Sequence, residues 1–138
     1  MRSLSYLLVA ATGLALLPGC GPPTIAPVRG RVTCNGKPVP DAALIFSPIP
    51  KNANDKESGK AAAAGTDADG YFTLSTFKEG DGGLIGKHRV SITIDENSKL
   101  PCKSKVMEIE IKPGDNEVNI ELDPKGPQNP KGPQKGSQ

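Results

Sequence analysis

Apolar and polar residues alternate in short runs separated by turn signals, and this pattern constrains the fold more than any other feature of the chain. The run 88–94 places His88 on one face with three aliphatic residues, and Arg89, Ser91 and Thr93 on the other. Comparable runs lie at 28–34, 71–76, 107–111 and 118–122. Successive side chains of a strand point to opposite faces, so each run predicts a half-buried strand. Six or seven such strands predict an all-β, antiparallel β-sandwich.

Two further segments predict strands on weaker patterns. Residues 42–47 are apolar on both faces, which predicts a central strand that is covered on both sides. Residues 61–66 contain four consecutive alanines, but the close glycines on either side favour a short strand over a helix. Asn35-Gly36 predicts a hairpin, and the glycine-rich segment 77–86 predicts a loop.

The N-terminus carries a short apolar run that ends in Leu17-Pro18-Gly19-Cys20. Residues 4–17 form a 14-residue stretch, too short for a membrane span of about 20 residues but typical of a signal peptide. Gly19 is the small residue that cleavage requires, and Cys20 supplies a thiol for lipid attachment. We therefore predict a bacterial lipoprotein signal peptide at 1–19 and a lipid-anchored (palmitate-carrying) Cys20. The alternative is a plain secretory signal followed by an accidental cysteine.

These features divide the chain into four parts. Cleavage leaves a lipidated N-terminus and proline-rich tether at 20–27, followed by a β-sandwich at 28–123. In the tail, 124–138, a Lys-Gly-Pro-Gln motif recurs and large apolar residues are absent. Such a segment cannot bury enough surface to order itself, so we predict disorder, with an interaction segment as the alternative. The predicted location is the bacterial cell envelope, facing the periplasm or the cell surface.

The cysteine count leaves one question open. If Cys20 carries lipid, Cys34 and Cys102 remain as a pair, which could oxidise to a disulfide outside the cytoplasm. A bridge requires Cα atoms roughly 4.4–6.8 Å apart, which sequence alone does not reveal. A disulfide and two separate thiols both remain open.

Composition and the few reactive side chains argue against several functions. A net charge of +2 without a basic stripe argues against nucleic acid, and 4% aromatic residues with no tryptophan argue against a carbohydrate platform. His88 is the only histidine, so a carboxypeptidase-type zinc site cannot form. A nucleophilic pair of His88 with either cysteine is conceivable, but a core histidine is favoured.

One acidic motif resembles a metal loop. Asp67-Ala68-Asp69-Gly70 is similar to the opening of a calcium loop, but Lys78 stands where the twelfth-position glutamate would be. We favour a tight turn in which the aspartates bind their own backbone. The sequence thus predicts no catalytic residue, no metal and no cofactor.

Motifs in a consistent order cover most of the predicted domain, at 28–33, 35–39, 42–46, 66–74, 81–83, 86–90 and 113–116. Together they resemble the carboxypeptidase regulatory-like family, whose domain is also called transthyretin-like or prealbumin-like, and most of all its small bacterial lipoproteins. The resemblance implies a seven-stranded Greek-key sandwich without catalysis. The chain departs from the family at His88, where an aromatic residue is expected, and at 99–105, which is shortened.

The expected function is that of a non-enzymatic envelope lipoprotein whose β-sandwich acts in protein interaction or envelope structure. The alternative is a surface module that binds carbohydrate or peptide. The expected partners are the membrane, through the lipid on Cys20, and an envelope protein or glycan that the sequence does not name.

Overall fold

Ten β-strands and no helix make up residues 24–55 and 59–125, the part of the chain that a computed structural model describes. The strands are β1 (Ile25–Ala26), β2 (Val28–Cys34), β3 (Lys37–Pro38), β4 (Ala43–Pro48), β5 (Ala62–Gly65), β6 (Tyr71–Thr73), β7 (Gly83–Leu84), β8 (Gly86–Thr93), β9 (Lys105–Ile111) and β10 (Asn116–Leu122). Each predicted alternating run contains most or part of a strand, with the run at 71–76 a strand only over 71–73, so the all-β prediction is confirmed. The predicted signal peptide, Cys20 and residues 126–138 lie outside the described residues.

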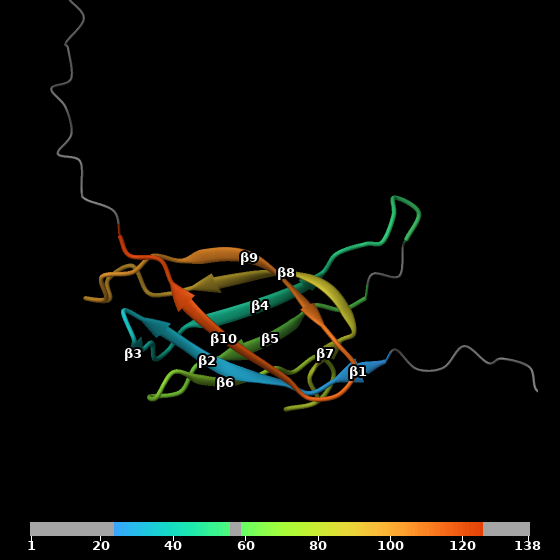
Figure 1. Cartoon of the computed structure of the whole chain (residues 1–138), viewed down its shortest axis with the longest axis horizontal. Helices are drawn as coiled ribbons and strands as arrows, with labels where there is room; N and C mark the ends of the chain where they lie inside the picture. Colours follow the sequence, from blue (N-terminus) through green and yellow to red (C-terminus); the bar gives the residue numbers. More distant parts are fainter. Residues whose placement is uncertain (1–23, 56–58, 126–138) are drawn as a thin grey trace, which may run out of the picture.

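The first sheet is built around β2, which pairs with β10 on one side and with β3 and β6 on the other (Figure 1). Val28–Cys34 and Asn116–Leu122 run parallel along their whole length. The expectation of a purely antiparallel arrangement was therefore wrong. A tight hairpin can connect only antiparallel strands. The chain between β2 and β10 comprises most of the domain, so this connection permits either strand direction.

The second sheet has the order β5-β4-β8-β9 and is antiparallel throughout. The segment 42–47 does form a central strand, β4, as predicted. The expectation that both its faces are covered was wrong, because Leu44 and Phe46 are buried whereas Ile45 is 43% exposed. An antiparallel sheet commonly packs one face on the core and leaves the other to solvent.

The inward faces of both four-stranded sheets contribute to one core. The Phe46 ring of the second sheet lies 6.4 Å from the Phe72 ring of the first, centroid to centroid. Most inward residues predicted from alternation are buried, among them Val28, Val32, Phe72, Leu74, Val90, Ile92 and Ile94. Burial of side chains of this size contributes about 1.5–3 kcal/mol each, so this core is the main source of stability.

The two sheets meet differently along their two edges. On one side, which we call the closed edge, Ala63 and Ser75 exchange two backbone hydrogen bonds of 2.9 and 3.0 Å, linking β5 to the segment after β6. On the other side, the open edge, β9 and β10 follow one another in sequence but join different sheets. At one end of the open edge, the amide of Lys103 donates to the carbonyl of Asp123 (3.0 Å) and that of Lys125 to the carbonyl of Pro101 (2.7 Å).

A small third sheet lies where a tether and a loop were expected. Ile25–Ala26 pairs with Gly83–Leu84, so the chain enters a sheet before the expected end of the tether at residue 27, and the expected loop at 77–86 contains a strand. Gly82 permits this contact, because a Cβ there would lie 1.9 Å from the Ala26 carbonyl oxygen. At the other terminus, backbone pairing continues to Lys125, beyond the expected start of the tail at residue 124.

The strands define two ends of the molecule. β1 and β7 lie at one end and β3 at the other, and β10 runs from the first end to the second (Figure 1). Within the described ranges, the chain has no helix with the length and apolar character that a membrane crossing requires.

Candidate functional sites

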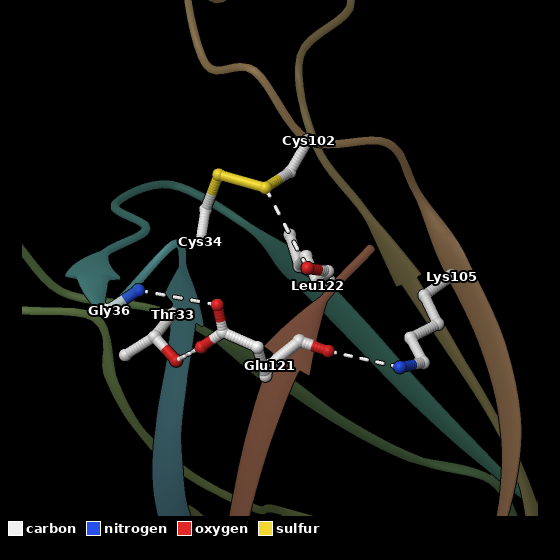
Figure 2. Close-up of a disulfide and its surroundings, with 7 residues drawn as sticks. All are labelled: Thr33, Cys34, Gly36, Cys102, Lys105, Glu121 and Leu122. Carbon is white, nitrogen blue, oxygen red and sulfur yellow. Dashed lines mark hydrogen bonds between the residues drawn. A yellow bond between two sulfur atoms is a disulfide. The ribbon is translucent and has the colours of Figure 1, made fainter. Parts of the chain in front are cut away.

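A disulfide joins Cys34, the last residue of β2, to Cys102 in the segment before β9 (Figure 2). Both residues are buried, and their Cα atoms lie 6.0 Å apart. The sequence left this pairing open, because 68 residues separate the two cysteines and only the fold brings them together. Since both sulfur atoms are bonded to each other, neither residue offers the thiolate that a cysteine–histidine pair needs.

Glu121 of β10 lies beside the disulfide and holds the hairpin that follows β2 (Figure 2). Its carboxylate accepts hydrogen bonds from the Thr33 hydroxyl and from the Gly36 amide, the latter at 3.3 Å. Asn35 and Gly36 have φ of 51° and 75°, as expected for the predicted two-residue hairpin. The Thr33 hydrogen bond above all, with the backbone amides of the hairpin, lowers the pKa of Glu121. Sequence reasoning missed this role, since it depends on the parallel β2–β10 pairing.

Lys105 bridges the open edge next to this cluster. Its Nζ donates to the backbone carbonyl of Glu121 (3.0 Å) and lies 3.3 Å from Asp123 Oδ1 in an ion pair. Lys105 is the first residue of β9, whereas Glu121 lies near the end of β10 and Asp123 follows that strand. The Lys105 side chain thus links β9 and β10, two edge strands that do not pair with each other.

His88 lies on the inward face of β8, as predicted, and is 1% exposed. Its Nδ1 lies 3.0 Å from the Gly86 carbonyl oxygen. Since a carbonyl only accepts, Nδ1 carries the proton and Nε2 is an acceptor, which has no partner among the described residues. Desolvation lowers the pKa of His88, so the ring is neutral, and it packs against Phe46 at 6.2 Å between centroids.

An open groove of about 1160 Å³ adjoins His88 at the β1 end of the molecule. Apolar side chains such as Ile49 and Ile85 line it together with charged ones such as Lys87 and Glu110. Thr24, the first described residue, also lines it. The groove therefore lies next to the point where the preceding N-terminal segment joins the domain.

The predicted calcium-like motif forms a backbone turn. Asp67 Oδ1 accepts hydrogen bonds from the amides of Asp69 and Tyr71, both at 2.9 Å. This geometry is the self-bonded aspartate turn that we favoured. No group of three or more metal-ligating side chains is found in 24–55 and 59–125.

Asp81 organises the glycine-rich segment in the same way. Its carboxylate accepts from the amides of Thr76 (2.7 Å), Phe77 (3.0 Å) and Lys78 (2.9 Å). These bonds, that of Thr76 above all, lower the pKa of Asp81. The glycines around it serve the turn that leads into β7.

The outer face of the first sheet is polar and holds a shallow hollow of about 500 Å³. Tyr71 is 53% exposed there, with the Arg31 guanidinium 5.0 Å from its ring centroid. Arg31 Nε donates to the Asp69 carbonyl (2.9 Å), and Asn119 Nδ2 donates to Glu117 Oε1 (3.2 Å). This face was not predictable from the sequence, because β10 contributes to it only through the parallel pairing.

The outer face of the second sheet carries a row of small and apolar side chains. Ile45 of β4 lies opposite Ser91 of β8, which in turn lies opposite Val106 of β9. Ala63 of β5 lies opposite Ile45 on the other side. Val106 is 65% exposed and Ile45 is 43% exposed. We call Ala63, Ile45, Ser91 and Val106 the apolar row.

No protein-family model matches the sequence, and a comparison with curated proteins finds no relative. The fold is similar to the crystal structure of a DUF3823 family protein from Parabacteroides merdae ATCC 43184, with 21% sequence identity and a TM-score of 0.45. The similarity covers 72% of this chain and 46% of that one, so the chain spans less than half of the structure that it matches.

Proposed function

We propose that the chain is a non-enzymatic, lipid-anchored protein of the bacterial cell envelope whose β-domain binds another protein. The apolar row carries this proposal. Ile45 and Val106 are large aliphatic side chains that are exposed and aligned by the strand register, and neither lines the groove or the hollow described above. Each square ångström of such surface that a partner covers contributes about 25 cal/mol before the costs of association. Such a face fits a protein surface better than a small ligand, which requires a concave site.

The disulfide supports a location outside the cytoplasm. Cytoplasmic reductants keep thiols reduced, whereas the periplasm and cell surface allow a bond such as Cys34–Cys102 to persist. Cys20, the proposed lipid attachment site, stands four residues before Thr24. A four-residue connection spans at most about 14 Å, so the anchor would hold the β1 end of the domain near the membrane.

We also propose that the two four-stranded sheets form a Greek-key sandwich of the carboxypeptidase regulatory-like type. The common core supports this assignment, as does the position of the motifs at 28–33 and 86–90 within β2 and β8 and of the motif at 42–46 at the start of β4. The two-residue strands β1, β3 and β7 are then short additions to a seven-stranded framework.

A non-enzymatic role is supported by the state of the reactive groups. The two cysteines of the domain are joined to each other, and the neutral His88 ring packs against Phe46 in the core. The carboxylates of Asp67, in the calcium-like motif, and of Asp81 accept hydrogen bonds from backbone amides. Structural roles therefore account for the presence of these reactive side chains.

A second candidate function is the binding of a carbohydrate or peptide on the outer face of the first sheet. The exposed Tyr71 ring beside Arg31, next to the Asn119 amide, favours it. An aromatic face with adjoining amide and carboxylate groups is suited to stack on and hydrogen-bond a polar ligand.

Cross-linking of the full-length protein in intact cells tests these alternatives. Ile45→Lys should remove the cross-linked protein partner, because a charge in the apolar row must be desolvated on binding. Thr93→Lys, which adds the same charge to the same face outside the row, should leave the partner in place. A signal on a glycan array that Tyr71→Ala removes, with cross-linking unaffected by Ile45→Lys, would favour the second function instead.

The anchor is tested separately by intact mass and detergent partition. The wild-type protein should carry the mass of acyl chains and enter the detergent phase. Cys20→Ala should lose both properties, since two acyl chains, unlike one, anchor a protein stably. A wild-type mass without acyl chains would contradict the lipoprotein assignment and leave the protein-binding assignment in place.

A further inference from the structure

We propose that β9 receives an extended segment of the partner, with alternating basic and apolar residues, as an added strand at the open edge. This inference rests on the proposed function and names the chemistry of the partner. Three features of the edge support it: an unpaired strand, half-buried apolar side chains along it, and acidic outward side chains on β9 that lie opposite basic ones on β8.

β9 is an edge strand whose other side is fully paired. Lys105–Ile111 pairs with Gly86–Ile92 of β8, and no described strand pairs with its opposite side. An edge strand leaves a row of backbone N–H and C=O groups available to another chain. β10, the next strand, is paired to β2 in the other sheet. An added strand would therefore extend the second sheet beyond β9, on the side where β10 belongs to the other sheet.

The apolar side chains at this edge are only partly covered. Met107 and Ile109 of β9 and Val118 of β10 pack against the core but are half-buried. Inward side chains of an added strand would lie beside Met107 and Ile109, because cross-strand neighbours on one face have Cβ atoms about 4.5–5.5 Å apart. Apolar residues at every second position of the partner would complete this burial.

The outward side chains of β8 and β9 determine which charge the partner segment should carry. On β8, Lys87 and Arg89 lie opposite Glu110 and Glu108 of β9. The outward charges thus change from basic on β8 to acidic on β9, and a basic residue on the next strand continues the series. Opposite charges across a strand pair stabilise it, whereas like charges destabilise it.

The same charges argue against a second copy of this chain as the occupant. If β9 paired antiparallel with β9 of another molecule, the outward residues Glu108 and Glu110 would face glutamates of the other copy. Natural proteins use such charges on edge strands to prevent self-association. A partner with the opposite charge pattern meets no such barrier.

The test uses the full-length protein in mild detergent and a labelled octapeptide of four Lys-Val repeats, close in length to β9. Fluorescence anisotropy measures its affinity. Two control peptides have four Glu-Val repeats or the same lysines and valines in two blocks. The alternating Lys-Val peptide should bind at least about tenfold more tightly than either control, since only it matches both charge and period. Hydrogen exchange should show new protection in β9.

Variants of the protein distinguish strand addition from nonspecific electrostatic attraction of the basic peptide. Glu108→Lys with Glu110→Lys should weaken binding by about tenfold or more, while Glu79→Lys with Glu96→Lys, an equal charge change at exposed sites elsewhere, should change it less than about twofold. Unchanged melting temperatures verify that both variants fold. Equal losses in the two variants, or equal binding of the block peptide, would overturn the proposal.

Other occupants give distinct results. Peptide binding that requires removal of residues 126–138 would assign the edge to the chain's own C-terminal segment, and a dimer that Met107→Lys dissociates would assign it to a second copy. Either result overturns the proposal. If the peptide fails to bind while Ile45→Lys still abolishes cross-linking in cells, this inference fails and the proposed function stands.

Discussion

The closed and open edges of the domain are held by different means. At the closed edge, the backbones of Ala63 and Ser75 pair directly, and the two residues are near each other in sequence. At the open edge, β9 and β10 diverge into separate sheets. The turn 112–115 joins them at the β1 end, and the cross-links between the sheets are gathered at the other end. These links are the Cys34–Cys102 disulfide, the Lys105 bridge and the backbone bonds around Cys102.

This difference shows how a small domain can leave a sheet edge available without losing its fold. Backbone pairing along the whole open edge would occupy the groups that an added strand needs. A covalent bond and a lysine at one end hold β2, β10 and the start of β9 together and leave the rest of β9 unpaired. The open edge should therefore depend on a few individual residues, and the closed edge on its backbone pairing.

The largest expected effect is that of removing the disulfide. Replacing both Cys34 and Cys102 by alanine should lower the free energy of unfolding by about 4 kcal/mol, because the unfolded chain is freed from a long closed loop. Urea denaturation measures the loss, and reduction of the wild-type protein provides a control. Hydrogen exchange should rise in β9 and β10 more than in β5 and β6. An equal rise at both edges would contradict the comparison.

The next largest effect is the difference in stability between two glycine substitutions, one in β2 beside β10 and one in β5 at the closed edge. A Cβ at Gly30, in β2 opposite β10, would lie 1.7 Å from the carbonyl oxygen of Val118, whereas at Gly65 in β5 the nearest atom is 3.9 Å away. Gly30→Ala should therefore cost about 3 kcal/mol by forcing β2 and β10 apart. Gly65→Ala should cost less than about 0.5 kcal/mol. Denaturation midpoints compare the two, and similar losses would show that β2–β10 tolerates expansion.

The sequence predicted the individual strands better than the way in which they pair. Alternation located β2, β8, β9 and β10 and put residues such as Phe72 and Val90 inside, since period-two patterns report burial directly. The parallel pairing of β2 with β10 was not predictable, because two strands so far apart in sequence can pair in either direction. The exposed Ile45 was taken for a buried residue for a related reason: an apolar side chain does not reveal whether its face is covered.

The candidate sites follow the same division. Local chemistry identified the turns at Asn35-Gly36 and Asp67, whose hydrogen bonds are made within a few residues. The Glu121 cluster, the Tyr71 face and the apolar row each combine strands from distant parts of the chain. No motif marks them, and they became visible only when the register was known.

A smaller effect concerns pH at the other end of the open edge, where His88 lies opposite Ile109 of β9. Burial lowers the pKa of His88 in the folded state below the value of about 6.5 expected for the unfolded chain. Above that pH both states are neutral and stability is unaffected. As pH falls below about 6.5, the unfolded state takes up a proton first, so stability decreases by up to about 1.4 kcal/mol per pH unit.

His88→Phe should remove this dependence between pH 7 and 5.5, while the decrease at lower pH remains, because Glu121 and Asp81 have lowered pKa values and lose their stabilising hydrogen bonds only as they are protonated. Urea denaturation at both pH values compares the variant with the wild type. If the variant kept the slope between pH 7 and 5.5, another group would be responsible for it.

The smallest expected effect is that of the Lys105 bridge. Lys105→Met keeps an aliphatic chain of similar length but removes the hydrogen bond to the Glu121 carbonyl and the ion pair with Asp123. Exposed ion pairs contribute about 0.2–1 kcal/mol, so the loss of stability should be about 1 kcal/mol or less. Lys103→Met, an equal change at a nearby exposed lysine, is the control and should have a smaller effect. The difference between the two variants should shrink at high salt, because the ion-pair part is screened. A larger local consequence is expected in hydrogen exchange at the start of β9, where Lys105 is the side chain that links the two edge strands. If exchange there matched the Lys103→Met control, the disulfide and backbone bonds alone would hold the open edge.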